Sequence, residues 1–123
     1  MPELDAKGAA IADLPTLWDG FASLLRAGLG ISAFGANIMH LPPDYETKSH
    51  DESGSGQEEL YVALAGSGAV VLDDGTRLQL DSDHVVAVGP GRGRVLASGA
   101  DGMRVLIIGS APGKGYEPMD WSS

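Results

Sequence analysis

The stretch HDESGSGQEELYVALAGSG, which runs from His50 to Gly68, says more about the fold than any other part of the chain. It opens on a histidine, carries an acidic residue two positions later at Glu52, and crosses a glycine- and serine-rich gap. It then passes through Glu59 into an apolar run that reaches Gly66. The charged residues beside the start of this predicted strand are the first candidates for a functional site.

This stretch resembles the first motif of the cupins, which reads G-x5-H-x-H-x3/4-E-x6-G. His50 matches the first histidine, Glu59 matches the glutamate, and Gly66 follows at the required spacing. Glu52 occupies the position of the second histidine, and the gap before Glu59 is longer than in the usual motif. The resemblance implies the cupin fold and leaves the chemistry open.

The second cupin motif, G-x5-P-x-G-x2-H-x3-N, is matched in part further along the chain. Gly89-Pro90-Gly91 fits its P-x-G, but Arg94 stands at the histidine position and Ser98 at the asparagine position. The resemblance covers about residues 31–110. Short sequence segments near the C-terminus are also similar to segments of small bacterial cupins. The resemblance implies an all-β chain folded as a double-stranded β-helix, the jelly-roll barrel.

The pattern of residues favours the same architecture. Leu60, Val62 and Leu64 alternate with other residues at the period of a strand. Asp73-Asp74-Gly75 is a strong hairpin signal, because glycine tolerates the positive φ of such turns. Residues 31–41 form a predicted strand that ends at two prolines. Short strands separated so regularly by turns are typical of a jelly roll.

A short helix is predicted before the barrel. Asp13 is a helix-start signal, and a set of apolar residues at helical spacing follows it, before a stop at Gly28 or Gly30. That set comprises Leu17, Trp18, Phe21, Leu24 and Leu25. We therefore expect residues 1–30 to form a tail and helix that pack on the barrel, and residues 31–123 to form the barrel of a single domain.

Composition excludes several classes of partner. The chain has 123 residues, a net charge of −9 and no cysteine, which limits it to one core without disulfides or thiolate ligands. The acidic balance disfavours nucleic acid and anionic membranes as partners. The start of the chain lacks the apolar run of a secretory signal, and no stretch is long enough to cross a bilayer. We expect a soluble, cytoplasmic protein.

The candidate metal ligands follow from the resemblance. A common cupin centre uses three histidines and one glutamate, and the matching positions here are His50, Glu52, Glu59 and Arg94. One imidazole and two carboxylates form a set that suits harder ions, whereas a guanidinium is not a metal ligand. The expected cofactor is therefore either none, with Arg94 bridging to Glu52 or Glu59 as a bidentate ion pair, or a weakly held divalent metal.

Other polar residues are assigned by position. Tyr61 lies two residues after Glu59 and hence on the same face of the strand, as either a pocket wall or a core aromatic. Gln57 and His40 are further candidates for ligand binding beside Arg94, although a lone strand histidine is more often packed or exposed than a ligand. Glu59 and His50 are the candidate catalytic pair.

Two classes of function remain open. The chain is either an enzyme on a small organic molecule, of isomerase, cyclase, lyase or dioxygenase type, or a non-catalytic module that binds a small molecule such as an anion drawn to Arg94. We also expect a homodimer, because the N-terminal apolar set and the C-terminal Tyr116, Met119 and Trp121 exceed what one barrel needs to bury.

Overall fold

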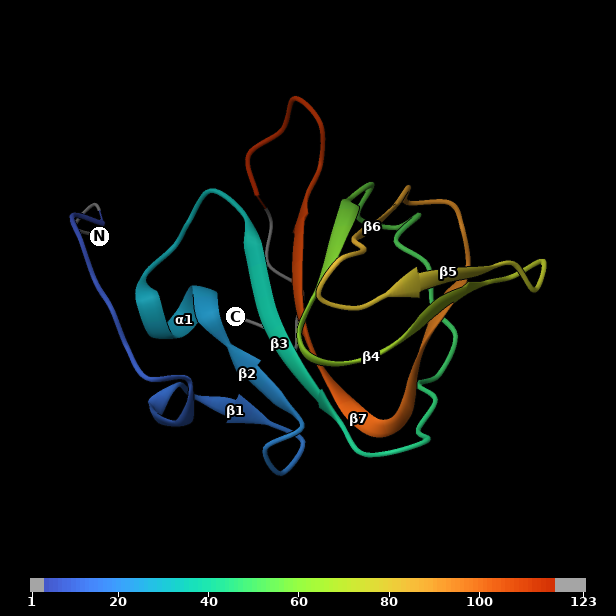
Figure 1. Ribbon diagram of the computed structural model, residues 1–123. Coiled ribbons are helices and arrows are strands. Elements are labelled where there is room, and N and C mark those ends of the chain that lie inside the picture. The colour runs from blue at the N-terminus through green and yellow to red at the C-terminus, as the bar shows by residue number, and fades with distance from the viewer. Residues whose placement is uncertain (1–3, 117–123) are drawn as a thin grey trace.

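The computed structural model describes residues 4–116 of the chain, which fold as an all-β barrel (Figure 1). The elements are η1 (Ile11–Asp13), β1 (Thr16–Leu17), β2 (Ala22–Leu24), α1 (Leu25–Leu29), β3 (Gly35–Leu41), β4 (Glu58–Leu72), β5 (Arg77–Leu80), β6 (Val86–Val88) and β7 (Arg94–Ser110). The sheet has the strand order β1-β2-β3-β7-β4-β5, and β6 pairs with β4. All the strand pairs are antiparallel. The predicted double-stranded β-helix is confirmed.

Two long strands, β4 and β7, run through both halves of the barrel and pair along almost their whole length. Their register shifts between Ala63 and Ala65 and between Gly66 and Gly68, and such bulges bend a strand and increase its twist. Gly66 has a φ of 72°, and a Cβ there would collide with the backbone of Gly102. Glycine at this position therefore permits the corner that folds the sheet onto itself (Figure 1).

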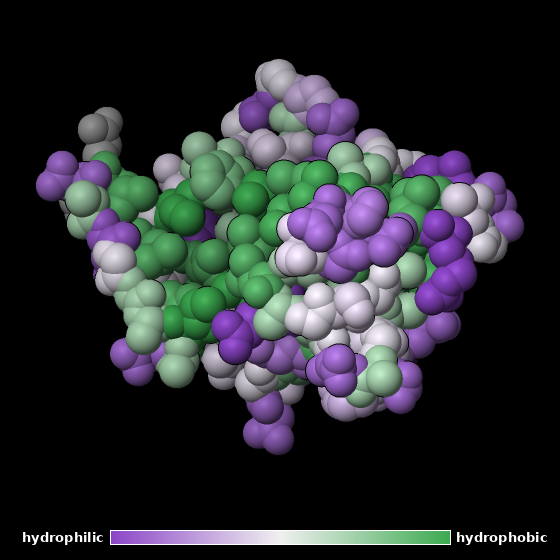
Figure 2. All heavy atoms as spheres, in the orientation of Figure 1, coloured by the Kyte–Doolittle hydropathy of each residue, from purple (hydrophilic) through white to green (hydrophobic). Residues whose placement is uncertain are grey.

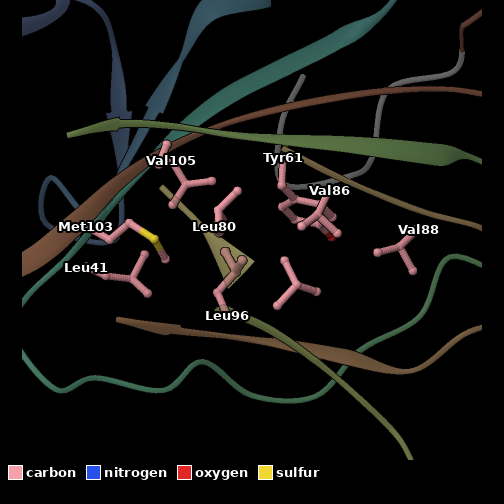
Figure 3. Packing of buried hydrophobic residues seen from close by; sticks show 10 residues of the cluster. Leu41, Tyr61, Leu80, Val86, Val88, Leu96, Met103 and Val105 are labelled. Atoms are coloured by element: carbon pink, nitrogen blue, oxygen red, sulfur yellow. The ribbon is translucent and has the colours of Figure 1, made fainter. Parts of the chain in front are cut away.

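Alternation along the strands decides which side chains face the barrel interior. Glu59 and Tyr61 on β4 lie opposite Val88 and Val86 on β6, and their side chains point inward with these valines. The buried hydrophobic cluster fills one part of the interior (Figure 3). Its members are Leu41, Tyr61, Ala63, Val70, Leu80, Val86, Val88, Leu96, Met103 and Val105. Tyr61 is fully buried and lies where this packed region meets the polar site.

The N-terminal helix predicted from Asp13 to a stop at Gly28 or Gly30 is wrong in extent, although the stop at Gly30 is confirmed. After the short 3-10 helix η1, this segment forms β1 and β2, and only the five residues of α1 are α-helical. Trp18, Asp19 and Gly20 have positive φ values of 55°, 55° and 88°, which interrupt a helix and turn the chain. β2 then pairs with β3. The open edge of β3 offers backbone hydrogen bonds, and this tertiary pairing overrides the helical spacing of the apolar residues.

The hairpin predicted at Asp73-Asp74-Gly75 is present between β4 and β5, with a φ of 88° at Gly75. The expected contribution of Met119 and Trp121 lies outside the described residues. Within residues 4–116, no helix is long and apolar enough to cross a membrane.

Candidate functional site

A cavity of about 660 Å³ opens beside the inner face of β3 and β7. Its walls are mainly apolar and aromatic, with Phe21, Met39, Tyr45, Leu96, Ile107 and Tyr116 among them. His50, Glu52 and Glu59 line the same cavity and form its polar end. On the face shown in Figure 2, apolar residues gather over the half of the molecule that carries β1, β2 and β3. The cavity is therefore suited to a ligand with an apolar body and a polar head.

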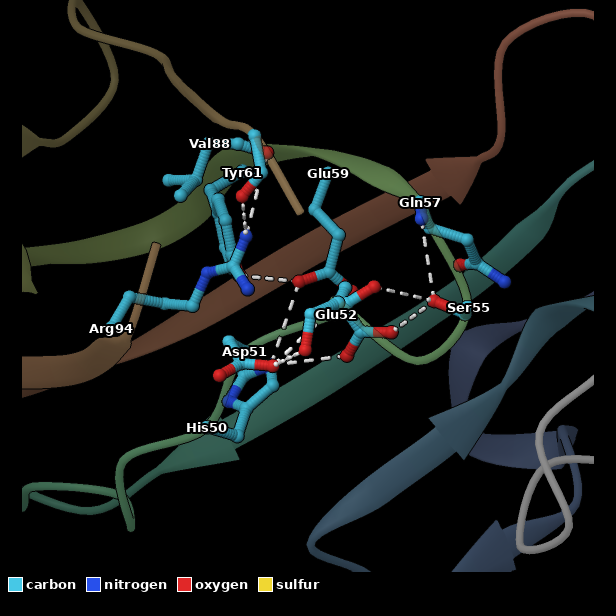
Figure 4. A network of polar contacts seen from close by, with 11 residues as sticks. His50, Asp51, Glu52, Ser55, Gln57, Glu59, Tyr61, Val88 and Arg94 are labelled. Carbon is cyan, nitrogen blue, oxygen red and sulfur yellow. Dashed lines mark hydrogen bonds and ion pairs between the residues drawn. The ribbon is translucent and has the colours of Figure 1, made fainter. Parts of the chain in front are cut away.

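The three residues of the first motif converge at this polar end (Figure 4). His50 Nε2 lies 3.4 Å from Glu52 Oε2 and 3.6 Å from Glu59 Oε1. One potential ligand atom from each residue lies within 4.8 Å of the other two. Both carboxylates are buried, whereas the imidazole is about half exposed. The structure thus brings together the whole predicted set of metal ligands.

The segment between Glu52 and Glu59, which is longer than in the usual cupin motif, folds into a tight turn. The amides of Ser55 and Gly56 donate to the carbonyl of Glu52 at 3.1 and 2.7 Å, and Gly56 takes a φ of 71°. The Ser55 hydroxyl also donates to Glu52 Oε1 at 2.8 Å. The Glu52 amide is held by the Pro90 carbonyl. These contacts fold the extra residues away and leave Glu52 Oε2 facing His50 (Figure 4).

The two carboxylates have different electrostatic environments. Burial raises the pKa of Glu52, because the charged form loses hydration. Burial acts in the same direction on Glu59, but contacts from His50 and Tyr61 and the positive charge of Arg94 outweigh it and lower the pKa of Glu59. Glu59 is therefore the fixed anion of the site, and Glu52 is the carboxylate that accepts a proton more readily.

Arg94 enters the barrel interior from the start of β7 and is only 1 % exposed. Its Nη2 donates to the carbonyls of Gly89 and Val88 at 2.8 and 3.4 Å. Among residues 4–116, no carboxylate lies within 4.0 Å of it, so the expected bidentate bridge to Glu52 or Glu59 is wrong. Tyr61 and His50 already contact Glu59 Oε1, and only Nη2 of the Arg94 guanidinium is bonded, to the carbonyls of Val88 and Gly89. Its Nε and Nη1 are buried without a hydrogen-bond partner among residues 4–116. Arg94 acts on the carboxylates through its charge.

The remaining predicted residues divide between the cavity and the outside. Gln57 is buried and lines the cavity, and Gly109 leaves space for it, since a Cβ there would lie 2.8 Å from Gln57 Oε1. His40 does not line the cavity: it follows Met39 on β3, hence faces outward, and contacts Ser23 at 2.9 Å. Burial, with the charge of Arg104, lowers the pKa of His40.

Sequence reasoning missed most of the apolar walls. Trp18 and Phe21 were assigned to a helix, yet both line the cavity, and Phe21 packs against Tyr45 with ring centroids 5.7 Å apart. Tyr45 lies in the connection between β3 and β4, where no periodicity marks it. The aromatic content of these segments was the only available signal, and it did not indicate which surface they form.

The fold defines a class of protein, the double-stranded β-helix barrel. The candidate site lies in the cavity that His50, Glu52 and Glu59 line. Among solved structures, the chain is similar to a cupin protein from Bacteroides fragilis, with a TM-score of 0.70 and 20 % identity, covering 99 % of this chain and 95 % of that one. It is also similar to an RmlC-like cupin from Desulfovibrio desulfuricans, with a TM-score of 0.67 and 16 % identity over 86 % and 97 % of the two chains.

A third similar structure is a Cupin 2 conserved barrel domain protein from Salinispora arenicola, with a TM-score of 0.66 and 18 % identity over 90 % and 92 % of the chains. No protein-family model matches the sequence, and no curated protein matches it. The particular fold is that of a small single-barrel cupin, as the two motifs predict, and identities this low establish the fold alone.

Proposed function

We propose that this protein binds a small organic molecule in the cavity and holds a divalent cation weakly at His50, Glu52 and Glu59. The observation that carries the proposal is the convergence of one imidazole and two carboxylates at the polar end of an otherwise apolar cavity. Buried carboxylates so close together repel each other and require a cation or a proton-donating ligand beside them.

The three donors fit a divalent metal ion. Imidazole nitrogen and carboxylate oxygen are ligands for Zn²⁺ and Mn²⁺. Donors about 2.0–2.1 Å from a tetrahedral ion lie roughly 3.4 Å apart, which is close to the 3.4 and 3.6 Å from His50 Nε2 to the two glutamates. The nearby charge of Arg94 opposes a cation, and residues 4–116 supply only three protein ligands. We therefore expect weak, exchangeable binding.

A bound cation would supply Lewis-acid polarisation of an oxygen on the ligand. The residues of the chain perform the positioning: Tyr61 orients Glu59, Ser55 orients Glu52, and the aromatic walls keep water from the ligand. In an enzymatic role without a bound cation, Glu52 would accept or return a proton and Glu59 would stay ionised. This favours proton-transfer chemistry, as in an isomerase, cyclase or lyase.

The alternative of an anion-binding module has less support. Although Nε and Nη1 of Arg94 have no hydrogen-bond partner among residues 4–116, Arg94 is not among the residues that line the cavity, and its Nη2 donates to carbonyl oxygens. An anion entering the cavity would meet three carboxylates, those of Asp51, Glu52 and Glu59, against the single lysine Lys48, and like charges repel strongly where water is partly excluded. The ligand we propose is therefore neutral, with its polar head directed at His50, Glu52 and Glu59.

Titration calorimetry with Mn²⁺ and with Zn²⁺ tests the metal site, and fluorescence titration with the neutral apolar dye N-phenyl-1-naphthylamine tests the cavity. We expect one exchangeable ion per chain in the wild-type protein, and no binding by His50→Ala or Glu52→Gln. His84→Ala is the matched control, because His84 is exposed and contacts Asp81 outside the cavity. A wild-type protein that binds neither metal nor dye would contradict the proposal.

A further inference from the structure

Tyr116 lines the cavity although it follows the last strand and lies outside both motifs. After β7 ends at Ser110, the chain turns, with the Lys114 amide donating to the Ala111 carbonyl at 3.3 Å and Gly113 at a φ of 67°. This turn returns the chain to the start of β3, where the Tyr116 side chain contacts the Gly35 position. The cavity wall is thus completed by a segment that the barrel itself does not require.

Gly35 provides the space that Tyr116 occupies. A Cβ at Gly35 would lie 2.7 Å from Cζ and 2.8 Å from Cε1 of Tyr116, which is closer than van der Waals contact allows. Gly35 pairs with Gly109 across β3 and β7, and a Cβ at Gly109 would collide with Gln57. Two paired glycines therefore make room for two separate parts of the cavity wall, the Tyr116 ring and the Gln57 amide.

Arg26 on α1 holds the same ring from outside the barrel. Its guanidinium carbon lies 5.6 Å from the centroid of the Tyr116 ring, within the range of a cation–π interaction. The Arg26 Nε is buried and makes no hydrogen bond to any residue from 4 to 116. Because a buried N–H without a partner is costly, contact with the electron-rich ring offsets part of the cost of burying this guanidinium.

We propose that Tyr116 is a ligand-binding residue whose ring, positioned by Gly35 and Arg26, selects ligands with a flat apolar body such as an aromatic ring. This inference rests on the proposed binding function of the cavity. Phe21 and Tyr45 add further aromatic surface to the same cavity, and aromatic rings pack favourably in tilted or offset arrangements. A ring-shaped ligand body would use these surfaces, whereas a flexible chain would lose more conformational entropy on binding.

Fluorescence titration with N-phenyl-1-naphthylamine, which carries two aromatic ring systems, tests this role. We expect Tyr116→Ala to weaken binding of the dye about tenfold. Gly35→Ala should weaken it to a similar degree, because it displaces the ring without removing it. Arg26→Met should weaken it about threefold, and Tyr116→Phe, which keeps the ring, should bind within about twofold of wild type.

Two controls separate a local effect from a structural one. Binding of Mn²⁺ should be unchanged in all four variants, because none alters His50, Glu52 or Glu59. His84→Ala changes an exposed residue outside the cavity and should leave dye binding unchanged. Circular dichroism checks folding, and if Gly35→Ala does not fold, Tyr116→Ala and Arg26→Met decide the question.

Wild-type affinity for the dye in both Tyr116→Ala and Arg26→Met would overturn the role of Tyr116 while leaving the cavity function intact. Loss of Mn²⁺ binding together with dye binding in Tyr116→Ala would also overturn it, since that result indicates a general structural effect. A wild-type protein that binds Mn²⁺ but not the dye would overturn the inference and the organic-ligand part of the proposed function together.

Discussion

The hydroxyl of Tyr61 donates a 2.6 Å hydrogen bond to Oε1 of Glu59. The two residues are separated by one position on β4, so both point into the barrel (Figure 4). Burial, followed by the negative charge of Glu59, raises the pKa of Tyr61, and the phenol stays protonated as a permanent donor. This bond fixes the orientation of Glu59 from inside the hydrophobic core.

Tyr61→Phe should destabilise the protein by about 1–3 kcal/mol, because a buried carboxylate loses a hydrogen bond that its charge strengthens. Urea unfolding at neutral pH measures this difference. Tyr45→Phe is the matched control, since Tyr45 is exposed and no hydrogen bond of its hydroxyl to another described residue is present. Equal stability of Tyr61→Phe and wild type would show that the bond contributes nothing.

Arg94→Met should lower the free energy of unfolding by about 2–3 kcal/mol. The variant leaves the carbonyls of Val88 and Gly89 without their buried donor and removes the positive charge that stabilises Glu59. Adding Glu59→Gln should restore part of the loss, because the uncompensated anion is then gone. Thermal unfolding of the wild type, the two single variants and the double variant completes a double-mutant cycle. An unchanged melting temperature in Arg94→Met would contradict the role assigned to this side chain.

The stability contributions of Glu59 and Glu52 should change with pH in opposite directions. The pKa of Glu59 lies below its usual value of 4.5 in the folded protein. The stabilisation that the Glu59 carboxylate contributes is therefore complete at pH values above 4.5, and it is lost as the pH falls through the folded pKa. The pKa of Glu52 is raised, so its contribution is complete below the usual value and is lost as the pH rises through the folded pKa.

Glu59→Gln should therefore be less stable than wild type by about 1 kcal/mol at neutral pH, and this difference should shrink towards about pH 3. Glu52→Gln should gain stability relative to wild type as the pH rises from about 4 to about 7. Urea unfolding across this range measures both. Parallel pH profiles for the two variants would contradict the assignment of Glu59 as the fixed anion.

A homodimer remains a prediction. The exposed apolar residues that the structure describes include Leu60, Leu64 and Val85 on the outside of β4 and beside β6, and exposed apolar patches often mark contacts between subunits. Light scattering at micromolar concentration should give twice the mass of one chain, and Leu64→Glu should shift that mass towards a monomer. A monomer mass for the wild-type protein would contradict the prediction.

Much of the fold was predictable because it depends on local signals. The hairpin at Asp73-Asp74-Gly75, the strand alternation around Leu60–Leu64 and the first cupin motif each follow from properties of neighbouring residues. The N-terminal segment was mistaken for a helix because Trp18, Phe21 and Leu25 fit helical spacing. Only the free edge of β3, which forms elsewhere in the chain, turns this segment into strands.

The candidate site, like the fold, depends partly on local signals and partly on tertiary structure. The sequence by itself indicated His50, Glu52 and Glu59 as candidate donors, through the resemblance to the first cupin motif. It also placed Tyr61 on the same face as Glu59, because a strand period of two fixes which neighbours share a face. Only the tertiary structure decided that Arg94 bonds to the carbonyls of Val88 and Gly89, since several acceptors compete for a guanidinium and their distances depend on the pairing of β6 with β4. Tertiary packing also decided that Tyr116 completes the cavity, because its contact with Gly35 joins residues far apart in the chain, and no local pattern encodes such a contact.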